Sequence, residues 1–594
     1  MFTLRLSRTD SNTRRNLHGE EYQVRTSFGY LGAILEGAEP TPSFHQGASD
    51  WVLLSGFPVN LDSVLRSLTV AQPLDAQPAS RTIPASLAWI YRRAGIDGLR
   101  RLEGCFALCL VDFDDGSIHV LRDRLGGRSA YVQVGPEQVL VASHAHRIAA
   151  YPTVRGEENP DYLALRVAYA GFPPPGTTPF RDIEEVLPGE HWQIRQGRVR
   201  RQRQALEIPS RFERRGVTDA IEGLRSRLET SVAAQTAGHD RFAAMLSGGL
   251  DSTPATALMA RHLGHRGGRL QAVSWSLAGA RSGDETRRIE ETAALLRIEL
   301  RLFNGHECVP FSGLDSTSIN PGFIELNAFR PLHHQAIQRA REEGCEAIVN
   351  FTAGDFLYPT PAHTLSGLIR GREWASALGI VARLMTTWNR GRRPWRSPML
   401  RGYLRGLRAR QAASQPYPYR LNFLTDAARK SLPPLPAPFA EAEAHPVPAF
   451  ARFMQTTLAY HRAQESYFAE RLGLGYLDPY QSEELARYML ALPFSYSYRN
   501  QQSKWIMRQL ARERIPESIR TTPRTGNLLG FLKFGYRKHH AQIVQVIAAG
   551  RPHWSRVLRT DRVDELLQRP HPSEADLVLV CQLLGYCLWC QVWK

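Results

Sequence analysis

Long apolar runs are missing from this sequence. No eighteen consecutive residues are apolar, so no transmembrane helix is expected. The first residues, MFTLRLSRTDSNTRRN, lack the apolar stretch that a secretory signal needs. Seven cysteines in 594 residues are too few for a disulfide framework and fit a reducing compartment. These absences predict a cytoplasmic protein without stable membrane insertion.

Acidic residues are also scarce. Asp and Glu number 57 against 74 Lys and Arg, a formal charge of +17, and nearly all of the basic excess is arginine. Two explanations fit. Either the protein binds something anionic, such as a nucleotide, nucleic acid, an acidic peptide or a membrane surface, or its genome favours arginine codons. Charge alone does not decide between them.

The chain is too long for one hydrophobic core, so two or more domains are expected, and it contains no internal repeat. Residues 1 to about 205 are rich in predicted strands. Three hairpins are expected there, at residues 106–124, 130–143 and 191–203. Their turns are Asp-Asp-Gly-Ser, Gly135-Pro136 and Gln196-Gly197.

After residues 211–215 the pattern changes to alternating helices and strands, which predicts a parallel α/β sheet covered by helices. The expected helices are 218–235, 253–263 and 284–297, and the expected strands are 241–247, 269–277 and 346–352. Beyond residue 450 the chain is predicted to be mostly helical.

An unusual segment interrupts this pattern at about 359–447. It carries many arginines, interleaved tryptophans and Glu373 as the only acid among its basic residues, followed by a Pro- and Ala-rich stretch, 430–450, that is typical of a semi-rigid linker. Arginines and tryptophans together can bind nucleic acid. A solvated or partner-binding face is the favoured interpretation, and no nucleic-acid partner is expected.

The lysine of a Walker A loop is missing, yet another phosphate loop is present. SGGLDS (247–252) follows a predicted strand and opens a predicted helix. Glycines and helix N-terminal amides form an anion site, and a carboxylate beside it can hold magnesium. The loop resembles the pyrophosphate loop of ATP pyrophosphatases, although a plain glycine turn is the alternative. The resulting nucleotide-binding candidates are Leu246, Ser247, Gly248, Gly249, Asp251 and Ser252.

Two neighbouring segments support this interpretation. Residues Val273 to Ser276 form the next strand, where ATP pyrophosphatases cradle adenine, so Val273 and Ser276 are further nucleotide-binding candidates. TAGDFLY (352–358) ends the third predicted strand and contributes Gly354 and Asp355. Asp355 can share magnesium with Asp251, although an aspartate that caps a helix is the alternative.

Several longer segments then resemble the asparagine synthetase family. They are GCFALCLVDFDDGSIHVLRDRLGGRSAYV (104–132), FRDIEEVLPGEHWQIRQGRVR (180–200), GYLDPYQSEELARYMLALP (475–493) and SKWIMRQLARERIPESIRTTPRTGN (503–527). The resemblance covers most of the chain apart from 359–447. It implies a two-domain α/β fold: an amidotransferase-like αββα sandwich over 1–210 and an ATP-pyrophosphatase domain over 211–594, with ATP and Mg²⁺ as cofactors.

Position 2 departs from the glutamine-using members of that family. Those enzymes carry a cysteine after the initiator methionine, whose amine and thiol hydrolyse glutamine. Here Phe2 takes that place and the nearest cysteine is Cys105, so no glutaminase activity is expected. Members that lack this cysteine include β-lactam synthetases and lasso peptide cyclases. Thr352 stands where the former have a tyrosine and asparagine synthetases have a glutamate. Both absences favour the lasso cyclase.

The family also implies two catalytic cations. Lys504 matches the earlier family lysine and is expected to contact the phosphates. The second family lysine, in an Arg-Pro-Lys-x-Gly segment, is replaced here by Arg524, which can hold phosphate but cannot donate a proton near neutral pH. Either electrostatics suffices at that step or Lys533 substitutes.

The resemblance therefore implies an ATP-dependent peptide macrolactam synthetase. It would adenylate an Asp or Glu side chain of a precursor peptide, and the N-terminal amine of that peptide would displace AMP. A leader-binding protein and a leader peptidase are expected partners. The alternatives are an asparagine synthetase-like or β-lactam synthetase-like small-molecule ligase and a catalytically silent nucleotide-binding regulator. Cys587 and Cys590 are expected in the core, and His333 and His334 on a helix.

Overall fold

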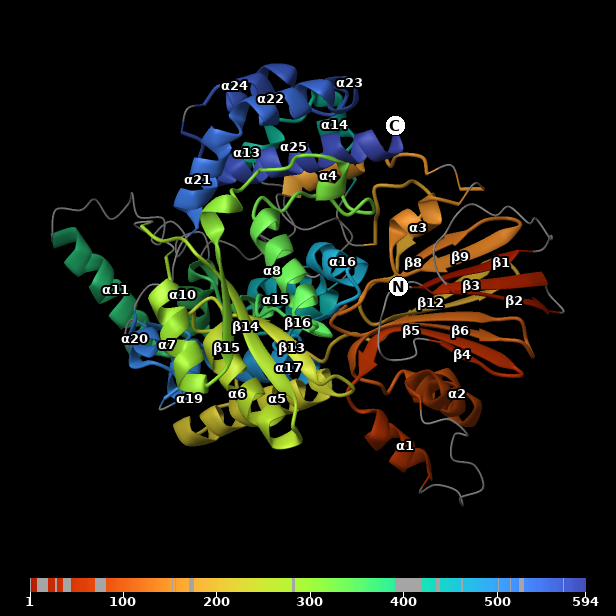
Figure 1. The fold of residues 1–594 in the computed structure, drawn as a ribbon, viewed down its shortest axis with the longest axis horizontal. Helices are drawn as coiled ribbons and strands as arrows, with labels where there is room; N and C mark the ends of the chain where they lie inside the picture. Colours follow the sequence, from red (N-terminus) through yellow and green to blue (C-terminus); the bar gives the residue numbers. More distant parts are fainter. Residues whose placement is uncertain are drawn as a thin grey trace.

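The computed structural model describes most of the chain. The residues outside its description are 1, 8–19, 27–28, 36–43, 70–81, 152, 155, 170–175, 280–283, 390–417, 434–438, 461–462, 500–501, 513, 523–527 and 570. The described part is mixed α/β, as predicted, with a strand-rich N-terminal half and a parallel sheet in the C-terminal half (Figure 1).

The N-terminal part is a sandwich of two six-stranded sheets. One has the strand order β10-β8-β9-β1-β3-β2 and the other β12-β11-β7-β6-β5-β4. The first contains β1 (Phe2–Ser7), β2 (Glu20–Thr26), β3 (Gly29–Leu35), β8 (Tyr131–Val134), β9 (Gln138–Ala142) and β10 (Glu184–Glu185). The second contains β4 (Phe44–Gln46), β5 (Asp50–Pro58), β6 (Gly104–Asp112), β7 (Ile118–Arg122), β11 (Glu190–Arg195) and β12 (Arg198–Arg203).

Alternation along the strands explains the layers. On β5, Trp51 and Leu53 point between the sheets, whereas Val52 and Leu54 pack against the helical layer. That layer is α1 (Leu61–Thr69) and α2 (Ile83–Leu99), and α3 (Ala145–Ala149) and α4 (Tyr162–Tyr169) lie on the other side (Figure 1). This order of layers is the αββα sandwich that the family resemblance implies.

All three predicted hairpins are confirmed. Strands β6 and β7, β8 and β9, and β11 and β12 each form antiparallel neighbours across the predicted turns. The short turns fix the register of each pair. Buried residues reinforce it in five of the six strands, whereas β12, at the edge of its sheet, has none.

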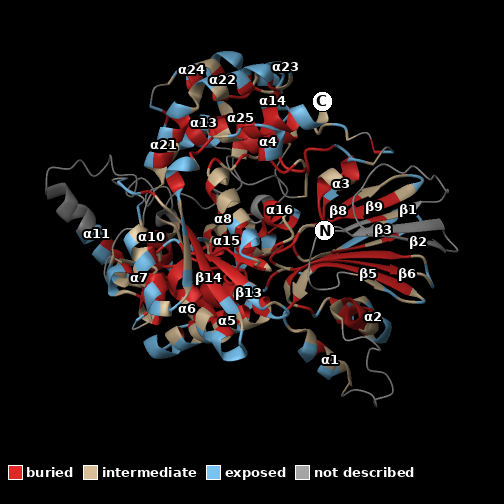
Figure 2. Cartoon of the chain, in the orientation of Figure 1, coloured by how far each residue is buried: buried red, intermediate tan, exposed pale blue. Residues whose placement is uncertain are grey.

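The C-terminal part is built on a five-stranded parallel sheet with the order β15-β14-β13-β16-β17. Its strands are β13 (Arg241–Met245), β14 (Arg269–Ser276), β15 (Glu299–Asn304), β16 (Ala347–Val349) and β17 (Gly475–Leu477). Helices cover both faces. Phe242 and Ala244 of β13 face one helical layer, and Ala243 and Met245 face the other (Figure 2).

Two of these strands were not predicted. In β15, the sequence ELRLFN mixes charges with apolar residues, because the strand lies at the sheet edge and no residue of it is fully buried. In β17 only three residues pair, too few for a periodic signal. The predicted helices 218–235, 253–263 and 284–297 are confirmed as α5 (Val217–Thr236), α6 (Ser252–Arg266) and α7 (Thr286–Leu296).

The remaining described elements are mostly helical, as predicted beyond residue 450. Those up to the predicted linker are α8 (Arg330–Glu342), α9 (Ala353–Phe356), α10 (Pro361–Arg370), α11 (Trp374–Asn389), α13 (Pro418–Leu421) and α14 (Asp426–Lys430). Those after it are α15 (Pro448–Tyr460), α16 (Ala463–Arg471), α17 (Glu483–Ala491), α18 (Phe494–Ser497), the short hairpin of β18 (Tyr498–Arg499) and β19 (Gln502–Ser503), α19 (Trp505–Leu510), α20 (Glu517–Thr521), α21 (Leu529–Lys538), α22 (His540–Ala549), α23 (Arg551–Trp554), α24 (Thr560–Leu567) and α25 (Glu574–Trp593).

The described part of the predicted linker is packed rather than extended. Phe439, Ala442 and Val447 are buried, and a 3-10 turn covers Ala440–Ala444. The Glu441 carboxylate accepts hydrogen bonds from both terminal nitrogens of Arg203, and this pair joins the segment to the last strand of the sandwich. The Pro- and Ala-rich composition of 430–450 therefore reflects a close-fitting irregular segment in these residues.

Helix α25 is the one described helix long and apolar enough to cross a membrane, and 72% of its apolar window is buried inside the protein. It packs against α22 and against residues of the sandwich and of α4 (Figure 1). Cys587 and Cys590 are buried in this cluster, as predicted. The helix thus serves as a core element that ties the C-terminal helices to the N-terminal sheets.

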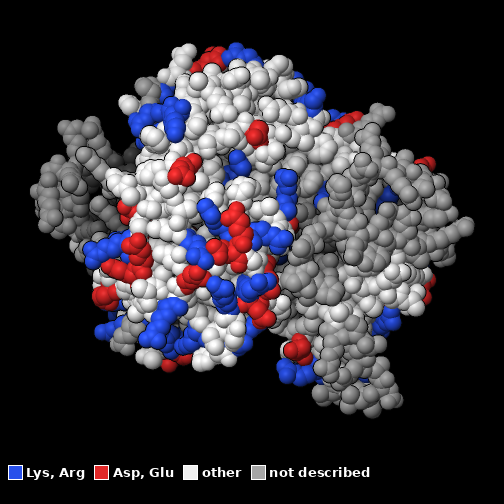
Figure 3. Space-filling model, in the orientation of Figure 1, with Lys and Arg blue, Asp and Glu red and all other residues white. Residues whose placement is uncertain are grey.

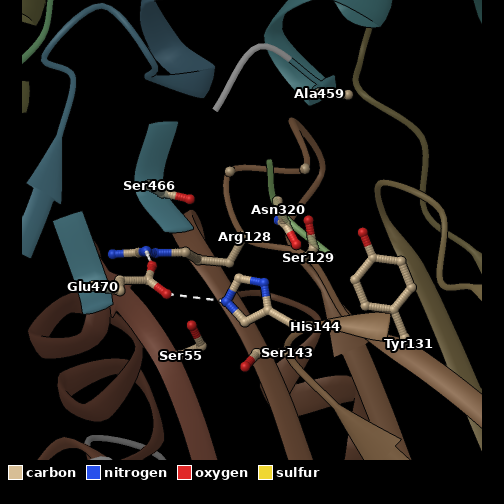
Figure 4. Close-up of a pocket in the computed structure, with 12 residues that line it drawn as sticks. Ser55, Arg128, Ser129, Tyr131, Ser143, His144, Asn320, Ala459, Ser466 and Glu470 are labelled. Atoms are coloured by element: carbon tan, nitrogen blue, oxygen red, sulfur yellow. Dashed lines mark hydrogen bonds and ion pairs between the residues drawn. The ribbon is translucent and has the colours of Figure 1, made fainter. Parts of the chain in front are cut away.

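Buried ion pairs also join the two parts. Glu470 on α16 accepts a hydrogen bond from Arg128 Nη1 at 2.6 Å and contacts His144 Nε2 at 3.1 Å, both from the sandwich (Figure 4). Serine hydroxyls and Asn320 surround this cluster and leave a cavity of about 20 Å³. That volume admits a water or two, so the cavity is part of the interface rather than a substrate site.

Candidate functional site

The predicted phosphate loop lies between β13 and α6, at the carboxyl end of the sheet. Ser252, the first residue of α6, binds Ser247 twice: its hydroxyl accepts from the Ser247 amide at 3.2 Å and meets the Ser247 hydroxyl at 2.9 Å. Gly248 has a φ of +67°, which favours glycine. The loop is therefore folded back on itself as an anion-binding turn needs to be.

Leu246 and the next strand support this turn. Leu246 is buried, and its amide donates to the carbonyl of Val273 at 3.2 Å. The Val273 side chain is fully buried in the core, so its contribution to a nucleotide is limited to its main chain. The hydroxyl of Ser276 accepts from Thr286 at 2.9 Å, at the end of β14.

Asp251 and Asp355 converge although about a hundred residues separate them. Asp251 closes the phosphate loop, and Asp355 lies on α9, which follows β16, the strand beside β13. Lys504 Nζ forms an ion pair with Asp251 Oδ2 and another with Asp355 Oδ1. The fold thus brings Lys504 to the two aspartates that the sequence predicted to share a metal ion.

Gly354 allows this convergence. A Cβ atom at position 354 would lie 3.0 Å from the Asp251 Cβ, Cγ and Oδ1 atoms. Gly354 is buried against Asp251, so the structure places it as a residue that permits close approach. Its predicted direct contact with nucleotide stays a prediction.

The buried carboxylate of Asp251 has too few positive charges and hydrogen-bond donors around it to offset its loss of hydration. Burial raises the pKa of its carboxyl to about 6, although Lys504 opposes that shift. Its second oxygen, Oδ1, is buried and has no hydrogen-bond partner among the described residues. For Lys504, burial lowers the pKa of the ammonium, but Asp251 and Asp355 outweigh it and the net shift is upward.

A divalent cation fits this arrangement. Two carboxylates face one point, and one of their oxygens is unsatisfied. Mg²⁺ typically binds one or two carboxylates together with substrate phosphates and keeps several waters. No group of three or more His, Cys, Asp or Glu side chains suited to a metal occurs among the described residues, so a dedicated all-protein cage is not found there.

Asp478 and Tyr480 hold the two aspartates in place and were not among the predicted site residues. The fully buried Asp478 carboxylate accepts from the amide of Ala353, which begins α9, at 2.9 Å, and from the Tyr480 amide at 3.0 Å. The Tyr480 hydroxyl donates to the Asp251 carbonyl at 2.8 Å. The signal was available, because both residues belong to the family-like segment GYLDPYQSEELARYMLALP.

Tyr358 is a second residue that sequence reasoning missed. Its ring centroid lies 5.6 Å from Lys504 Nζ, and the residue is buried beside both aspartates. Burial raises the pKa of its hydroxyl well above the ordinary value, so it stays protonated. Three residues after Asp355, it offers an aromatic face to the lysine ammonium.

Residue 524 lies outside the described residues, so the expected role of Arg524 stays a prediction. Thr522, just before that gap, is held by two arginines. Arg288 on α7 donates to its hydroxyl at 2.9 Å, and the buried Arg508 on α19 donates to its carbonyl at 2.9 Å. Lys533 lies on α21, which packs through Phe531 against Leu277 beyond β14.

Four further residues were weighed from the sequence. The Thr352 hydroxyl donates to Asn350 Oδ1 at 2.8 Å, so it is engaged in holding the turn. Glu373 accepts from the Ser495 amide at 3.1 Å at the start of α18 and serves that turn. His333 and His334 lie on α8, as predicted, and the His333 ring packs against Trp275.

Among its described residues, the N-terminal sandwich shows no comparable site. Position 2 is the phenylalanine that begins β1. Cys105 is buried in β6, and its thiol donates to the carbonyl of Gln481 at 3.3 Å. Neither residue offers an accessible nucleophile.

Two protein-family models match this chain. The family model described as "Asparagine synthase" matches residues 223–310 and 363–594, more than half of the chain. The model described as "Glutamine amidotransferase domain" matches residues 71–204. The chain belongs to the asparagine synthase family. This family uses ATP. The second matched stretch includes residues 363–447, so the expectation that the family resemblance leaves out the segment 359–447 was wrong for nearly all of that segment.

The curated relatives of this asparagine synthase family member are distant. Amidase chry2 from Gibberella zeae is 30% identical over 186 residues, 30% of this chain and 27% of that protein. Amidase chyE from Penicillium rubens is 26% identical over 176 residues, 29% and 25% of the two chains. Asparagine synthetase [glutamine-hydrolyzing] 3 from Bacillus subtilis is 25% identical over 171 residues, 29% and 28%. The matches span about a quarter of the length of these relatives.

Two solved structures are also similar, each at 15% sequence identity and a TM-score of 0.21. One is the allosteric regulatory enzyme of purine biosynthesis, with 46% of this chain and 66% of that chain covered. The other is glutamine phosphoribosylpyrophosphate amidotransferase from B. subtilis complexed with ADP and GMP, with 57% and 63% covered.

Proposed function

We propose that this protein is an ATP-dependent, AMP-forming amide ligase that closes a peptide macrolactam, as lasso peptide cyclases do. The observation that carries the ligase assignment is the convergence of Asp251, Asp355 and Lys504 at the mouth of the SGGLDS loop. Two carboxylates and a lysine beside a phosphate-binding turn suit the transfer of an adenylyl group. A bound Mg²⁺ would offset the charge of the phosphate oxygens there.

In the proposed reaction, a substrate carboxylate attacks the α-phosphate of ATP, forming an acyl-adenylate as the bond to pyrophosphate breaks. The loop amides and the hydroxyls of Ser247 and Ser252 hold phosphate oxygens. Lys504 offsets the negative charge that develops on the departing pyrophosphate, and Arg524 assists. An amine then attacks the activated carbonyl, AMP leaves, and the amine gives up a proton.

The N-terminal part indicates where the amine comes from. With Phe2 in place of the catalytic cysteine and Cys105 buried, the sandwich cannot release ammonia from glutamine. The amine must then arrive with the substrate. Joining a carboxylate and an amine of the same molecule closes a ring, and we assign these groups to an Asp or Glu side chain and the N-terminus of a peptide.

The peptide assignment rests on the site beside α9. The Thr352 hydroxyl donates a hydrogen bond to Asn350, and a threonine cannot act as the base that the tyrosine of small-molecule lactam synthetases supplies at this position. The basic, tryptophan-containing segment after α10 suits a large substrate. In this proposal the enzyme is cytoplasmic, and a leader-binding protein and a leader peptidase supply the linear peptide.

The deciding experiment is mass spectrometry of a linear core peptide incubated with Mg-ATP, this protein and the leader-processing partners. Loss of one water from the peptide, with AMP and pyrophosphate formed in equal amounts, is the expected result. The Asp251→Asn variant, in which the fold is kept, should lower the rate about 10²- to 10³-fold. AMP formation without water loss would reject the peptide and point to a small-molecule substrate. ATP binding without AMP would indicate a silent regulator.

A further inference from the structure

Lys504 occupies the position between the two carboxylates that we assign to the metal. Its ammonium pairs with Asp251 and Asp355 at the same time, and all three groups belong to different elements. No other described cation forms an ion pair with either aspartate. In the protein alone, the lysine is therefore the counter-ion of the site.

The lysine is an incomplete counter-ion. Two carboxylates carry two negative charges and the ammonium carries one positive charge. The buried Asp251 Oδ1 atom has no partner in the described structure. An ion with two positive charges would match the site better, and oxygen ligands of this kind are the ones Mg²⁺ prefers.

The geometry allows the ammonium to move while the backbone stays. Lys504 has a φ of +53° at the turn between β19 and α19, and the next residues, Trp505 and Ile506, are buried in the core. These contacts anchor its main chain. Its side chain is a flexible four-carbon stem, and the Tyr358 ring offers the ammonium a second favourable surface beside the carboxylates.

We propose that Lys504 is a resident cation that keeps the metal position closed until nucleotide binds, and then exchanges the two carboxylates for phosphate oxygens. An ammonium and a divalent ion repel each other and cannot share the same pair of carboxylates. ATP phosphates give the ammonium another anionic partner, so its departure becomes favourable only when ATP is present. This inference rests on the nucleotide site of the proposed function.

The exchange couples metal and nucleotide binding. Each ligand should raise the affinity for the other by the same factor, because coupling free energies are reciprocal. Metal alone should bind weakly, since it must displace Lys504 with no new partner for the ammonium. Replacing Lys504 by an uncharged side chain should have the unusual effect of improving metal binding.

The test is a titration of Mn²⁺ followed by electron paramagnetic resonance, with and without α,β-methylene-ATP. Wild-type protein should bind Mn²⁺ about tenfold or more tightly with the analogue than without it. The Lys504→Met variant should bind Mn²⁺ about tenfold more tightly than wild type in the absence of nucleotide, with little further gain from the analogue. Lys538→Met, a change on the exposed end of α21, is the matched control and should behave as wild type.

Two results would overturn the exchange. One is an unchanged or weaker Mn²⁺ affinity in nucleotide-free Lys504→Met that circular dichroism shows to be folded. The other is a gain that persists when Asp355→Asn is added, because the metal would then lie elsewhere. If wild type binds no Mn²⁺ even with the analogue, the proposed nucleotide site itself fails. Nucleotide-tightened binding in wild type with no gain in Lys504→Met rejects only the exchange.

Discussion

At the scale of single residues, the site depends on how closely Asp251 and α9 approach each other. The Asp251 main chain is fixed by Tyr480, and its carboxylate lies between Lys504 and the backbone at Gly354. The amide of Ala353 is fixed by Asp478. With both partners held, small changes in side-chain volume at position 354 must be absorbed by Asp251.

Gly354→Ala should therefore slow AMP formation without unfolding the protein. The added Cβ, 3.0 Å from the Asp251 carboxyl group, forces that group to shift by a few tenths of an ångström. Misplacement of this order can lower the rate about tenfold to 10²-fold. The measurement is the initial rate of AMP release, together with the thermal unfolding midpoint.

The matched control for this change is Gly379→Ala on α11, where a Cβ meets no atom within 4 Å. It should keep the wild-type rate. A Gly354→Ala enzyme as fast as wild type would show that Asp251 occupies a different position in the working enzyme.

At the scale of elements, the hairpin of α10 and α11 begins a few residues after Asp355 and leads away from the sheet (Figure 1). α11 carries apolar residues on two faces. Ala377 and Ile380 are buried, whereas Trp374, Leu378 and Val381, spaced four and three residues apart, are exposed. In the residues whose burial is described, the helix is thus docked by one of these two apolar faces.

This difference between the faces can be measured. Ile380→Ala should destabilise the protein by about 2–5 kcal/mol, because it leaves a cavity under the helix. Leu378→Ala, on the same helix but 65% exposed, should change the free energy of unfolding by less than about 0.5 kcal/mol. Chemical denaturation of the two variants gives both values. A Leu378→Ala cost equal to that of Ile380→Ala would mean that the outer face is covered in solution.

At the scale of the whole molecule, the N-terminal sandwich and the C-terminal part are joined by buried contacts. The Glu470 cluster crosses the boundary (Figure 4), and so does the apolar cluster around α25. The charged side chains on the surface, in contrast, are spread over the face that Figure 3 shows. On the face in Figure 3, basic and acidic side chains are interspersed. Ion pairs such as Arg301 with Glu343 and Arg269 with Glu299 bring opposite charges together in the described structure. The net charge of +17 is thus not gathered into one basic field on this face.

The Glu470 cluster should make stability depend on pH in acid. Burial raises the pKa of Glu470, but His144 and Arg128 outweigh it and hold the pKa well below the ordinary value. A lowered pKa contributes stability above the unfolded pKa, about 4.3, and loses it as the pH falls further. Glu470→Gln should cost about 3–5 kcal/mol at neutral pH because it strands Arg128, and the difference from wild type should shrink below about pH 4.

Thermal unfolding midpoints between pH 3 and pH 7 test this expectation. Glu565→Gln, at an exposed position on α24, is the control and should follow the wild-type curve. A constant gap between wild type and Glu470→Gln over the whole range would show that Glu470 is not ionised in the folded protein.

The sequence predicted those features that have a local signature. The three hairpins have polar turns between alternating residues, and SGGLDS carries its loop geometry in its own glycines. The sequence predicted that Asp251 and Asp355 share a metal ion, and the parallel order β13-β16 places the two aspartates together. It did not predict that Lys504, just before α19, pairs with both of them. The role of Arg288 has no sequence signature, since its partner Thr522 is more than two hundred residues away. The edge strand β15 was missed because its exposure removes the apolar signal.

The stretch from Asp478 to Glu483 has a consequence for anyone who wishes to shorten the protein. Asp478 and Tyr480 form hydrogen bonds with the backbone of Ala353 and Asp251. Two residues of the sandwich contact the same stretch: the Cys105 thiol donates to the Gln481 carbonyl, and the Arg124 guanidinium donates to the Glu483 carboxylate. Through these contacts the sandwich packs behind Asp478 and Tyr480, which hold the elements that carry Asp251 and Asp355. A shortened protein cut between the two parts would keep Asp251, Asp355 and Lys504 but lose the contacts from Cys105 and Arg124 that support this stretch.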